Sequence, residues 1–402
     1  MANRKINAAI AHAIEELKGK TVELSLKIHG DPELAFHEHH AAASLVEWLE
    51  AEGFAVETGV AGLETAFVAS RGSGSPCIAY ILEYDALPVL GHACGHNLIA
   101  SGGLTAATSV SRAFGAELPG TLMVIGAPAE EDGGGKIIEL DAGIFAGVDA
   151  ALMFHPSDRT LPWRNSLACS TLRIKFHGLA AHAAKEPQAG RNALTAMIQF
   201  FVAVDGLRQH IDPQARMHGI ITKGGSAPNV VPELTEAEFL VRHPRVAGAL
   251  ELEKRVRQCA AGAALMTGTE VEITEPTPLY ANRLDNRTMA QAVVTHLESF
   301  GVVVDIPQPD DRAGSSDIGN VSHMLPTIHP YLRIAPLGVP EHSHAFTNIT
   351  CSPFAHEQTL LMAHALALVG ADLLTDVEFL DRARKEFEAQ QHPAQHDISD
   401  VN

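Results

Sequence analysis

The chain has 402 residues, 46% of them hydrophobic and 19% charged, which predicts a globular protein of about two to three domains with substantial cores. Acidic side chains (48) outnumber lysines and arginines (29), the net charge is −19, and no Lys/Arg run is present that could follow a phosphate backbone or an anionic bilayer. We therefore expect neither nucleic acid nor a membrane as a partner, and no apolar run reaches transmembrane length.

The chain begins with a predicted helix over residues 5–18, and a second stretch with helical periodicity covers residues 38–52. Glu15, Glu16 and Lys18 interrupt the apolar positions of the first helix, so it lacks the continuous apolar core of a signal peptide. The five cysteines are scattered and odd in number, unlike a disulfide framework. These features predict a cytoplasmic protein whose cysteines stay free thiols.

Three continuous apolar runs follow: "CIAYILEY" (77–84), "TLMVIGAP" (121–128) and "VDAALMFH" (148–155). Runs of this kind, bounded by glycine or proline, predict strands that are buried on both faces of an α/β sheet. Each run ends at a cluster of polar residues. Because open α/β sheets bind ligands at the carboxyl ends of their strands, these clusters predict a functional site.

From about residue 170 the sequence changes to a regular alternation of apolar and polar residues, which predicts strands with one face exposed to water. The segments "LRIKFHG", "AEFLVRH" and "EVEIT" alternate in this way, and "RMHGIITKG" supplies a fourth strand. Helical stretches cover residues 191–210 and 246–267. The order β-α-β-β-α-β predicts a ferredoxin-like α+β domain (βαββαβ) inserted over residues 170–276.

Beyond residue 277 the chain returns to long apolar helices, among them a predicted buried helix in "LLMAHALALVGADLL" (360–374). The segment "EPTP" (275–278) is the expected exit linker of the insert. The sequence therefore predicts an α/β protein whose main domain, residues 1–169 and 277–402, is split by the insert.

The segment "GHACGHNLIA" (91–100) places a thiol between two imidazoles, at His92, Cys94 and His96, in a loop that contains glycine. Cys94 and His96 would offer two zinc ligands on one loop. The pattern alone is weak, because 22 histidines make a local Cys/His pair easy to find. Two other interpretations stay open: Cys94 is a nucleophile activated by His92 or His96, or the three side chains only pack.

The other clusters supply carboxylates and further imidazoles: Glu130, Glu131, His155, His342 and His344. Taken singly, they would be a solvated acidic loop and core histidines. Taken together they form a mixture of S, N and O donors that zinc accepts, and two cations roughly 3.5–4 Å apart can share one water and lower its pKa. In such a site Glu130 is the candidate general base and Glu131 a ligand.

In order and spacing, "EYDALPVLGHACGHNLIA", "PAEEDGGGKI", "GGSAPNVVP" and "GSSDIGNVS" resemble motifs of the di-metal aminoacylase and exopeptidase family. The most similar branch is that of the N-acyl-amino-acid amidohydrolases, which includes hippurate and p-aminobenzoyl-glutamate hydrolases and the β-alanyl-lysine dipeptidase. The resemblance implies a zinc-exopeptidase-like α/β catalytic domain with a mixed sheet. It also implies that the insert is a lid or dimerisation domain.

Carried over residue by residue, the resemblance implies two divalent metal ions, zinc or manganese, held by Cys94, His96, Glu131, His155 and His342. The same resemblance makes Glu130 the general base and then the general acid. It makes Asp85 a carboxylate that steadies a ligand histidine.

Four further residues take roles by the same resemblance. His182, in the insert, would reach across a homodimer to stabilise the tetrahedral oxyanion. Asn229 and Arg242 would hold the carboxylate of the substrate, and Asp317 would line the pocket. A turn at Asn229 and a strand-edge salt bridge at Arg242 are the structural alternatives.

Three positions qualify this assignment. Glu83 stands where much of the wider family has a ligand histidine, so we do not count it as a ligand. Asn97 stands where many relatives have aspartate, so that charge is absent. His344 lies two residues beyond His342 and is a rival ligand, although the motif favours His342.

The sequence thus predicts a metal-dependent enzyme that hydrolyses the amide bond of an N-acyl or aminoacyl amino acid, a small substrate with a free carboxylate. One alternative is a cysteine hydrolase that uses Cys94 as nucleophile. The other is a non-catalytic protein that binds a small ligand. The acyl group, the amino acid and the native metal stay open.

Overall fold

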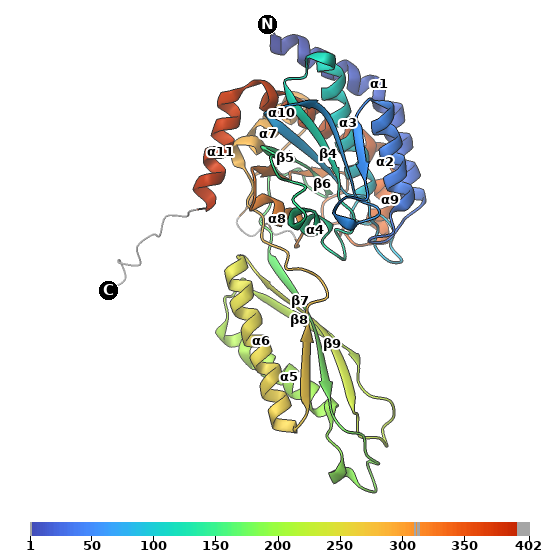
Figure 1. The fold of residues 1–402 in the computed structure, drawn as a ribbon, viewed down its shortest axis with the longest axis vertical. Coiled ribbons are helices and arrows are strands. Elements are labelled where there is room, and N and C mark those ends of the chain that lie inside the picture. Colours follow the sequence, from blue (N-terminus) through green and yellow to red (C-terminus); the bar gives the residue numbers. More distant parts are fainter. Residues whose placement is uncertain (1, 309–310, 312–313, 392–402) are drawn as a thin grey trace, which may run out of the picture. The chain divides into compact units, whose positions relative to one another are not determined.

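The computed structural model describes residues 2–308, 311 and 314–391, and the chain divides into two compact units (Figure 1). Unit 1 is formed by residues 1–164, 283–312 and 317–402, and unit 2 by residues 165–282 and 313–316. Unit 2 contains the whole predicted insert, 170–276, together with short flanking stretches. Residues 392–402 of the predicted main domain lie outside the described residues.

Unit 1 is built on a mixed six-stranded sheet. Its strand order is β1 (Ala55–Thr58), β2 (Phe67–Ser73), β4 (Gly120–Gly126), β3 (Cys77–Leu82), β5 (Ala150–Leu152) and β11 (Thr327–Ile328). The strands β4, β3, β5 and β11 are parallel, whereas β1 and β2 add an antiparallel edge. The α/β fold with a mixed sheet is therefore confirmed.

Helices cover both faces of this sheet in unit 1 (Figure 1). The helices described in unit 1 are α1 (Ala2–Gly30), α2 (His39–Ala51), α3 (His96–Phe114), α4 (Gly135–Asp141), α7 (Arg287–Ser299), α8 (Ile318–Ser322), α9 (His344–Thr350), α10 (Pro353–Thr375) and α11 (Val377–Gln391). Along β3 the side chains alternate between two cores: Ile78 and Tyr80 join α1, α3 and α10, whereas Ala79 and Ile81 join α8. A strand buried on both faces explains the continuous apolar run of the sequence.

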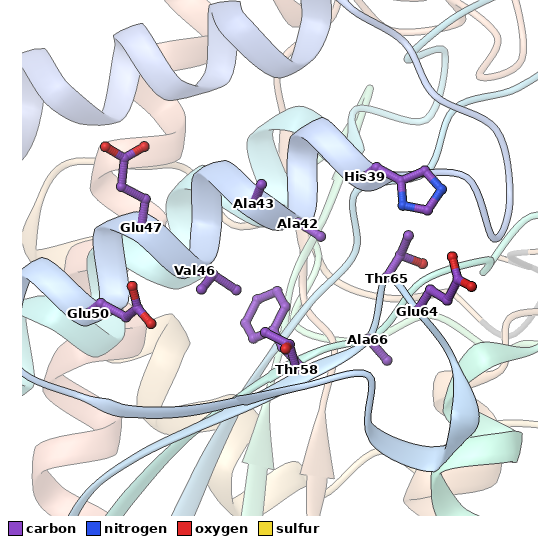
Figure 2. A pocket seen from close by; sticks show the side chains of 11 residues that line it. His39, Ala42, Ala43, Val46, Glu47, Glu50, Thr58, Glu64, Thr65 and Ala66 are labelled. Carbon is purple, nitrogen blue, oxygen red and sulfur yellow. The ribbon is translucent and has the colours of Figure 1, made fainter.

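A pocket of about 320 Å³ lies between α2 and the strands β1 and β2 (Figure 2). Ala42 and Val46 line it from the helix, Thr65 lines it from the turn before β2, and Phe67 lines it from the first position of β2. These two strands were not predicted. The residues of β1 are mostly exposed, so they lack the continuous apolar pattern that marks the central strands.

The predicted strand 148–155 is divided in the structure. β5 ends at Leu152, and β6 (His155–Ser157) pairs with β12 (Tyr331–Arg333) in a separate two-stranded sheet. Pro156 has no N–H group, so β6 suits a short edge pairing better than the interior of the main sheet. The break places His155 at the start of a new strand.

Helix α10 corrects the expectation that no run reaches transmembrane length. By length and composition it is apolar enough to cross a membrane, but most of its side chains are buried inside unit 1. It packs on α3, α1 and α7. The buried helix predicted for residues 360–374 is part of α10, which is a core helix of this unit.

Unit 2 has the predicted ferredoxin-like order. Its elements are β7 (Ala168–His177), α5 (Ala193–Leu207), β8 (Arg216–Lys223), β9 (Leu234–His243), α6 (Val246–Thr267) and β10 (Glu270–Thr274). The strands form an antiparallel sheet in the order β10-β7-β9-β8, and both helices pack on its apolar face. Short 3₁₀ turns lie at Val60–Gly62 and Gly115–Glu117 in unit 1, and at Pro187–Ala189 and Arg208–His210 in unit 2.

Candidate metal centre and active site

The chemistry-bearing residues of unit 1 lie where the parallel strands end. Glu83 and Asp85 follow β3, and Glu130 and Glu131 follow β4. His155 follows β5 by three residues. Because parallel strands end at the same edge of a sheet, the three loops lie together there. The structure thus brings these side chains into one site, as the strand-end pattern predicted.

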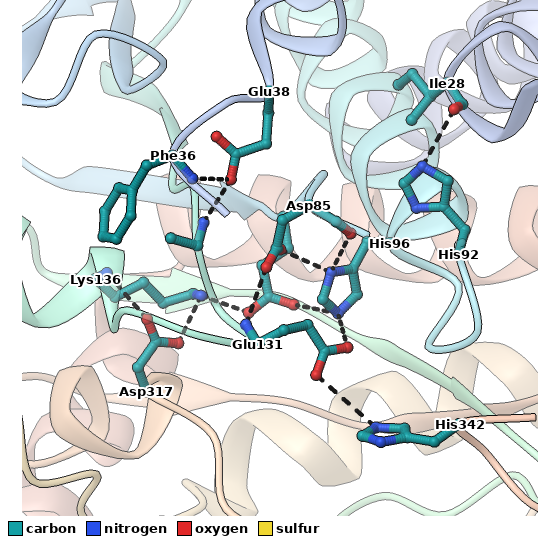
Figure 3. A network of polar contacts seen from close by, with 12 residues as sticks. Ile28, Phe36, Glu38, Asp85, His92, His96, Glu131, Lys136, Asp317 and His342 are labelled. Carbon is teal, nitrogen blue, oxygen red and sulfur yellow. Dashed lines mark hydrogen bonds and ion pairs between the residues drawn. The ribbon is translucent and has the colours of Figure 1, made fainter. Parts of the chain in front are cut away.

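His96 opens helix α3 and is fixed by Asp85 (Figure 3). Its Nδ1 donates to Asp85 Oδ1 at 2.9 Å and to the Asp85 carbonyl at 3.0 Å. Its Nε2 is buried and has no hydrogen-bond partner among the described residues. The carboxylates of Asp85, Glu83 and Glu131 raise the pKa of His96, although burial works against them. The surroundings of Nε2 therefore favour a positive charge, whether a proton or a metal ion.

The five predicted ligands form two overlapping groups. Cys94, His96 and His155 make the first, and Cys94, Glu131 and His342 make the second, with the ligand atoms of each group within 4.8 Å of one another. Cys94 belongs to both. Two adjacent groups with S, N and O donors suit two zinc-like cations.

His342 is the member supplied by the C-terminal part of the chain. Its Nε2 lies 3.8 Å from Glu131 Oε2 (Figure 3). Its backbone has a φ of 57°, in the left-handed region that costs a non-glycine residue free energy. Among the described residues the rival His344 belongs to no such ligand group, and it begins α9.

Two neighbouring histidines differ in which nitrogen carries the hydrogen. His155 Nδ1 lies 2.6 Å from the Pro156 carbonyl, which only accepts, so Nδ1 donates and the Nε2 lone pair is available to a metal. His329 Nδ1 lies 2.8 Å from the Arg283 guanidinium, which only donates, so the hydrogen of His329 is on Nε2. The rings are 5.6 Å apart, yet only His155 can be a ligand in this arrangement.

A buried ion-pair cluster lies beside these groups. Lys136 Nζ lies 2.5 Å from Glu83 Oε1 and 2.7 Å from Asp317 Oδ1, and the Lys136 backbone N–H donates to Asp317 Oδ2 at 3.0 Å. All three side chains are buried. Lys136 was not predicted, because three distant segments must fold together before it meets its partners. Its position directly after three glycines at the start of α4 was the available signal.

Glu130 lies between the ligand groups and this cluster. It has carboxylate oxygens within 4.8 Å of ligand atoms of His96 and Glu131, and also of Glu83 and Asp317. Burial, together with the charges of Glu83, Glu131 and Asp317, raises the pKa of Glu130 well above its usual value. A carboxylate in such surroundings is a stronger proton acceptor than one in water.

The Cys94 environment does not favour a nucleophilic thiol. Burial and the nearby carboxylates, chiefly Glu131, raise the pKa of Cys94 well above its ordinary value. The thiolate that nucleophilic attack requires is therefore disfavoured, whereas a bound cation would stabilise it. His92, the other proposed activator, bonds through Nε2 to the Ile28 carbonyl at 3.1 Å.

Unit 2 holds the other predicted residues. His182 and Asn229 lie on adjacent segments, since the Ala183 N–H donates to the Asn229 carbonyl at 3.0 Å. Arg242, on β9, donates to Ser315 Oγ at 3.0 Å within the same unit. The action of these three residues on a substrate stays a prediction.

Known proteins resemble this chain over nearly its whole length. Residues 169–265 match the peptidase dimerisation domain of the M20 family. The Xaa-Arg dipeptidase of Mus musculus is 36% identical over 395 residues, 94% of this chain and 91% of the relative. A p-aminobenzoyl-glutamate hydrolase polypeptide of Escherichia coli is 30% identical over 459 residues, 95% of each.

Solved structures agree on the fold. A dinuclear metal-binding peptidase of the M20 family from Bacillus subtilis superposes with a TM-score of 0.66 at 20% identity, covering 90% of this chain and 100% of that one. An aminobenzoyl-glutamate utilization protein from Klebsiella pneumoniae gives a TM-score of 0.72 at 18% identity, covering 91% and 99%.

The fold and the relatives define an enzyme of the peptidase and amidohydrolase class, which hydrolyses amide C–N bonds. Within that class the chain belongs to the M20 family. The family resemblance seen in the sequence is thereby confirmed.

Proposed function

We propose that the chain is a di-metal hydrolase that cleaves the amide bond between an acyl or aminoacyl group and an amino acid with a free carboxylate. The observation that carries the proposal is the pair of ligand groups that share Cys94, with Glu130 beside them. The relatives named Xaa-Arg dipeptidase and p-aminobenzoyl-glutamate hydrolase point to dipeptides and aroyl amino acids as the first substrates to test.

The residues present fit two divalent cations. Among the described residues, the carboxylates of Glu83, Asp85, Glu130, Glu131 and Asp317 gather here beside the ammonium group of Lys136. Buried carboxylates need compensating charge, and His96 Nε2 faces Glu83 at 3.6 Å and Glu131 at 3.8 Å without a hydrogen-bond partner among the described residues. When bound, zinc or manganese would lower the pKa of a water and polarise the substrate carbonyl.

Glu130 carries both proton transfers, and other side chains hold the ligands and the substrate in place. Glu130 takes a proton from the attacking water and then passes it to the nitrogen of the leaving amine. Asp85 holds the His96 ring in place and also accepts the backbone N–H of Glu131 at 2.9 Å, so one carboxylate orients two ligands. In unit 2, His182 is assigned to the oxyanion, and Asn229 and Arg242 to the substrate carboxylate.

Removal of the metals is expected to abolish hydrolysis of Xaa-Arg dipeptides or p-aminobenzoyl-glutamate, and Zn²⁺ or Mn²⁺ should restore it. Elemental analysis should count two ions per chain in the active protein, because the five predicted ligands form two groups. Activity that survives a strong chelator but is lost to iodoacetamide would instead favour Cys94 as nucleophile. Ligand binding without any product, across the same panel and with each metal, would favour a non-catalytic binding protein.

We also propose that the chain forms a homodimer through unit 2 in the cytoplasm. The match to a peptidase dimerisation domain supports the first part, and β8 is an edge strand with exposed Ile220 (65%) and Ile221 (42%). An exposed apolar edge strand is a template for pairing with a second chain.

Ile220→Lys is therefore expected to give a monomer by light scattering, with an unchanged circular dichroism spectrum. Leu265→Lys is the matched control, because Leu265 is exposed (86%) on helix α6 of the same unit. A wild-type monomer, or an equal loss of dimer in both variants, would contradict the role of β8.

A further inference from the structure

Glu38 is a buried carboxylate that lies just before α2 and accepts hydrogen bonds from outside that helix. Its side chain does not cap α2. Instead Oε1 accepts the N–H of Phe36 at 3.0 Å and the N–H of Ala129 at 2.9 Å (Figure 3). Oε2 accepts the hydroxyl of Thr65 at 2.8 Å, beside the pocket of Figure 2. One carboxylate therefore joins three segments.

Phe36 and Ala129, whose N–H groups donate to Glu38, both have a backbone conformation that is unfavourable for any residue with a side chain. Phe36 has a φ of 65° and Ala129 a φ of 58°, in the left-handed region. A non-glycine residue stays in this region only where the surroundings hold it there. Here one oxygen atom of Glu38 holds both residues.

Ala129 immediately precedes Glu130 and Glu131. The Ala129 carbonyl accepts the N–H of Gly134 at 2.8 Å, which closes the loop that carries both glutamates. The ring of Phe36 lies against this loop, since a Cβ at Gly133 would come within 2.4 Å of it. The segment of Glu38 and the loop of Glu130 are thus locked together by hydrogen bonds and by packing.

We propose that Glu38 is a positioning residue that fixes the backbone at Ala129, so that Glu130 and Glu131 face the metal groups. The proposal rests on the function proposed above for Glu130 and Glu131. Glu38 takes no part in proton transfer itself. Its oxygen must lie at the right distance from the Ala129 N–H, and its negative charge is secondary.

Three variants separate geometry from charge. Glu38→Gln keeps the length of the side chain and one carbonyl oxygen, so kcat should stay within a few-fold of the wild-type value. Glu38→Asp keeps the charge but withdraws the oxygen by one methylene group, and Glu38→Ala removes it. Both should lower kcat on the order of 10²-fold with little change in KM, because a misplaced base slows chemistry more than binding. Assays at saturating metal compensate for any weaker ligation by Glu131.

Glu33→Gln is the matched control. Glu33 lies in the same segment and accepts the N–H groups of His40 and Ala41 through its two oxygens, both within 3.0 Å, so it supports α2 but not Ala129. Its kcat should be unchanged. Equal kcat losses in Glu33→Gln and Glu38→Asp, or a Glu38→Asp enzyme as active as Glu38→Gln, would overturn the proposal.

Hydrogen exchange tests the proposal independently of activity. The amides of residues 129–134 should exchange faster in Glu38→Asp and Glu38→Ala than in Glu38→Gln, while α3 stays protected. If the wild-type protein hydrolyses no amide, the proposed function fails, but this exchange result still decides whether Glu38 holds the loop. Unchanged exchange in a folded Glu38→Asp protein would refute it.

Discussion

Glu130→Gln is expected to lose nearly all turnover while it still takes up two metal ions. The amide cannot accept the proton of the attacking water, and general acid-base catalysis of this kind contributes roughly 10²–10⁴-fold. We expect kcat to fall by about 10³-fold or more with KM nearly unchanged. The variant should also fold normally, because it replaces a carboxyl group whose pKa burial already raises.

Glu131→Gln provides the contrast for this experiment. Glu131 belongs to the ligand group with Cys94 and His342, so its variant should lose metal as well as turnover. Elemental analysis of the two variants side by side therefore distinguishes a base from a ligand. Wild-type turnover in Glu130→Gln would remove Glu130 from the mechanism.

Lys136→Met is expected to destabilise unit 1 by about 3–5 kcal/mol, the usual cost of leaving a buried charge without its partner. The substitution leaves Glu83 and Asp317 buried next to Glu130 without their ammonium group. Both tryptophans of the chain, Trp48 and Trp163, lie in unit 1, so their fluorescence during urea unfolding reports on this unit. An unfolding free energy within about 1 kcal/mol of wild type would contradict the prediction.

The double variant Lys136→Met with Glu83→Gln is the control, and it should recover part of the lost unfolding free energy by removing one unpaired carboxylate.

The loss of unfolding free energy in Lys136→Met should also shrink as the pH falls. Burial already raises the pKa of Asp317 to about 6, above the value expected for the unfolded chain. A carboxyl group with a raised folded-state pKa stabilises the fold at low pH and loses that contribution as the pH rises through about 6. Without Lys136 this pKa rises further, so the deficit is largest above pH 7.

Much of the fold followed from local patterns. Strand β3 is buried along almost its whole length, and its sequence is a continuous apolar run. Strand β7 of unit 2 is buried at alternate residues, and its sequence alternates in the same way. The exposed strand β1 has no such pattern. The short strand β6 pairs with β12, which is distant in sequence, so no local pattern predicts this pairing. It divides the run 148–155, which was predicted as one strand.

The candidate site was predictable to the extent that it follows strand ends. Glu130 and His155 could be placed together because they follow parallel strands of one sheet. His342 and Asp317 come from segments without that signal. The sequence offered His342 together with its rival His344, and the family resemblance then favoured His342 as the ligand. Lys136 binds Asp317 and Glu38 binds the Ala129 N–H, both across long stretches of sequence, so no local pattern identifies these two residues. The dimer role of His182 stays a prediction.

Because the two ligand groups share Cys94, oxidation of this one thiol would affect both cation positions. In the metal-free protein, burial and nearby carboxylates keep the proton on this sulfur, and oxidants attack thiols slowly in that form. Once oxidised, however, a single atom would be lost from both cation positions at the same time. Oxidative damage at Cys94 would therefore weaken both cation positions in one event, leaving His96 and His155 at one and Glu131 and His342 at the other.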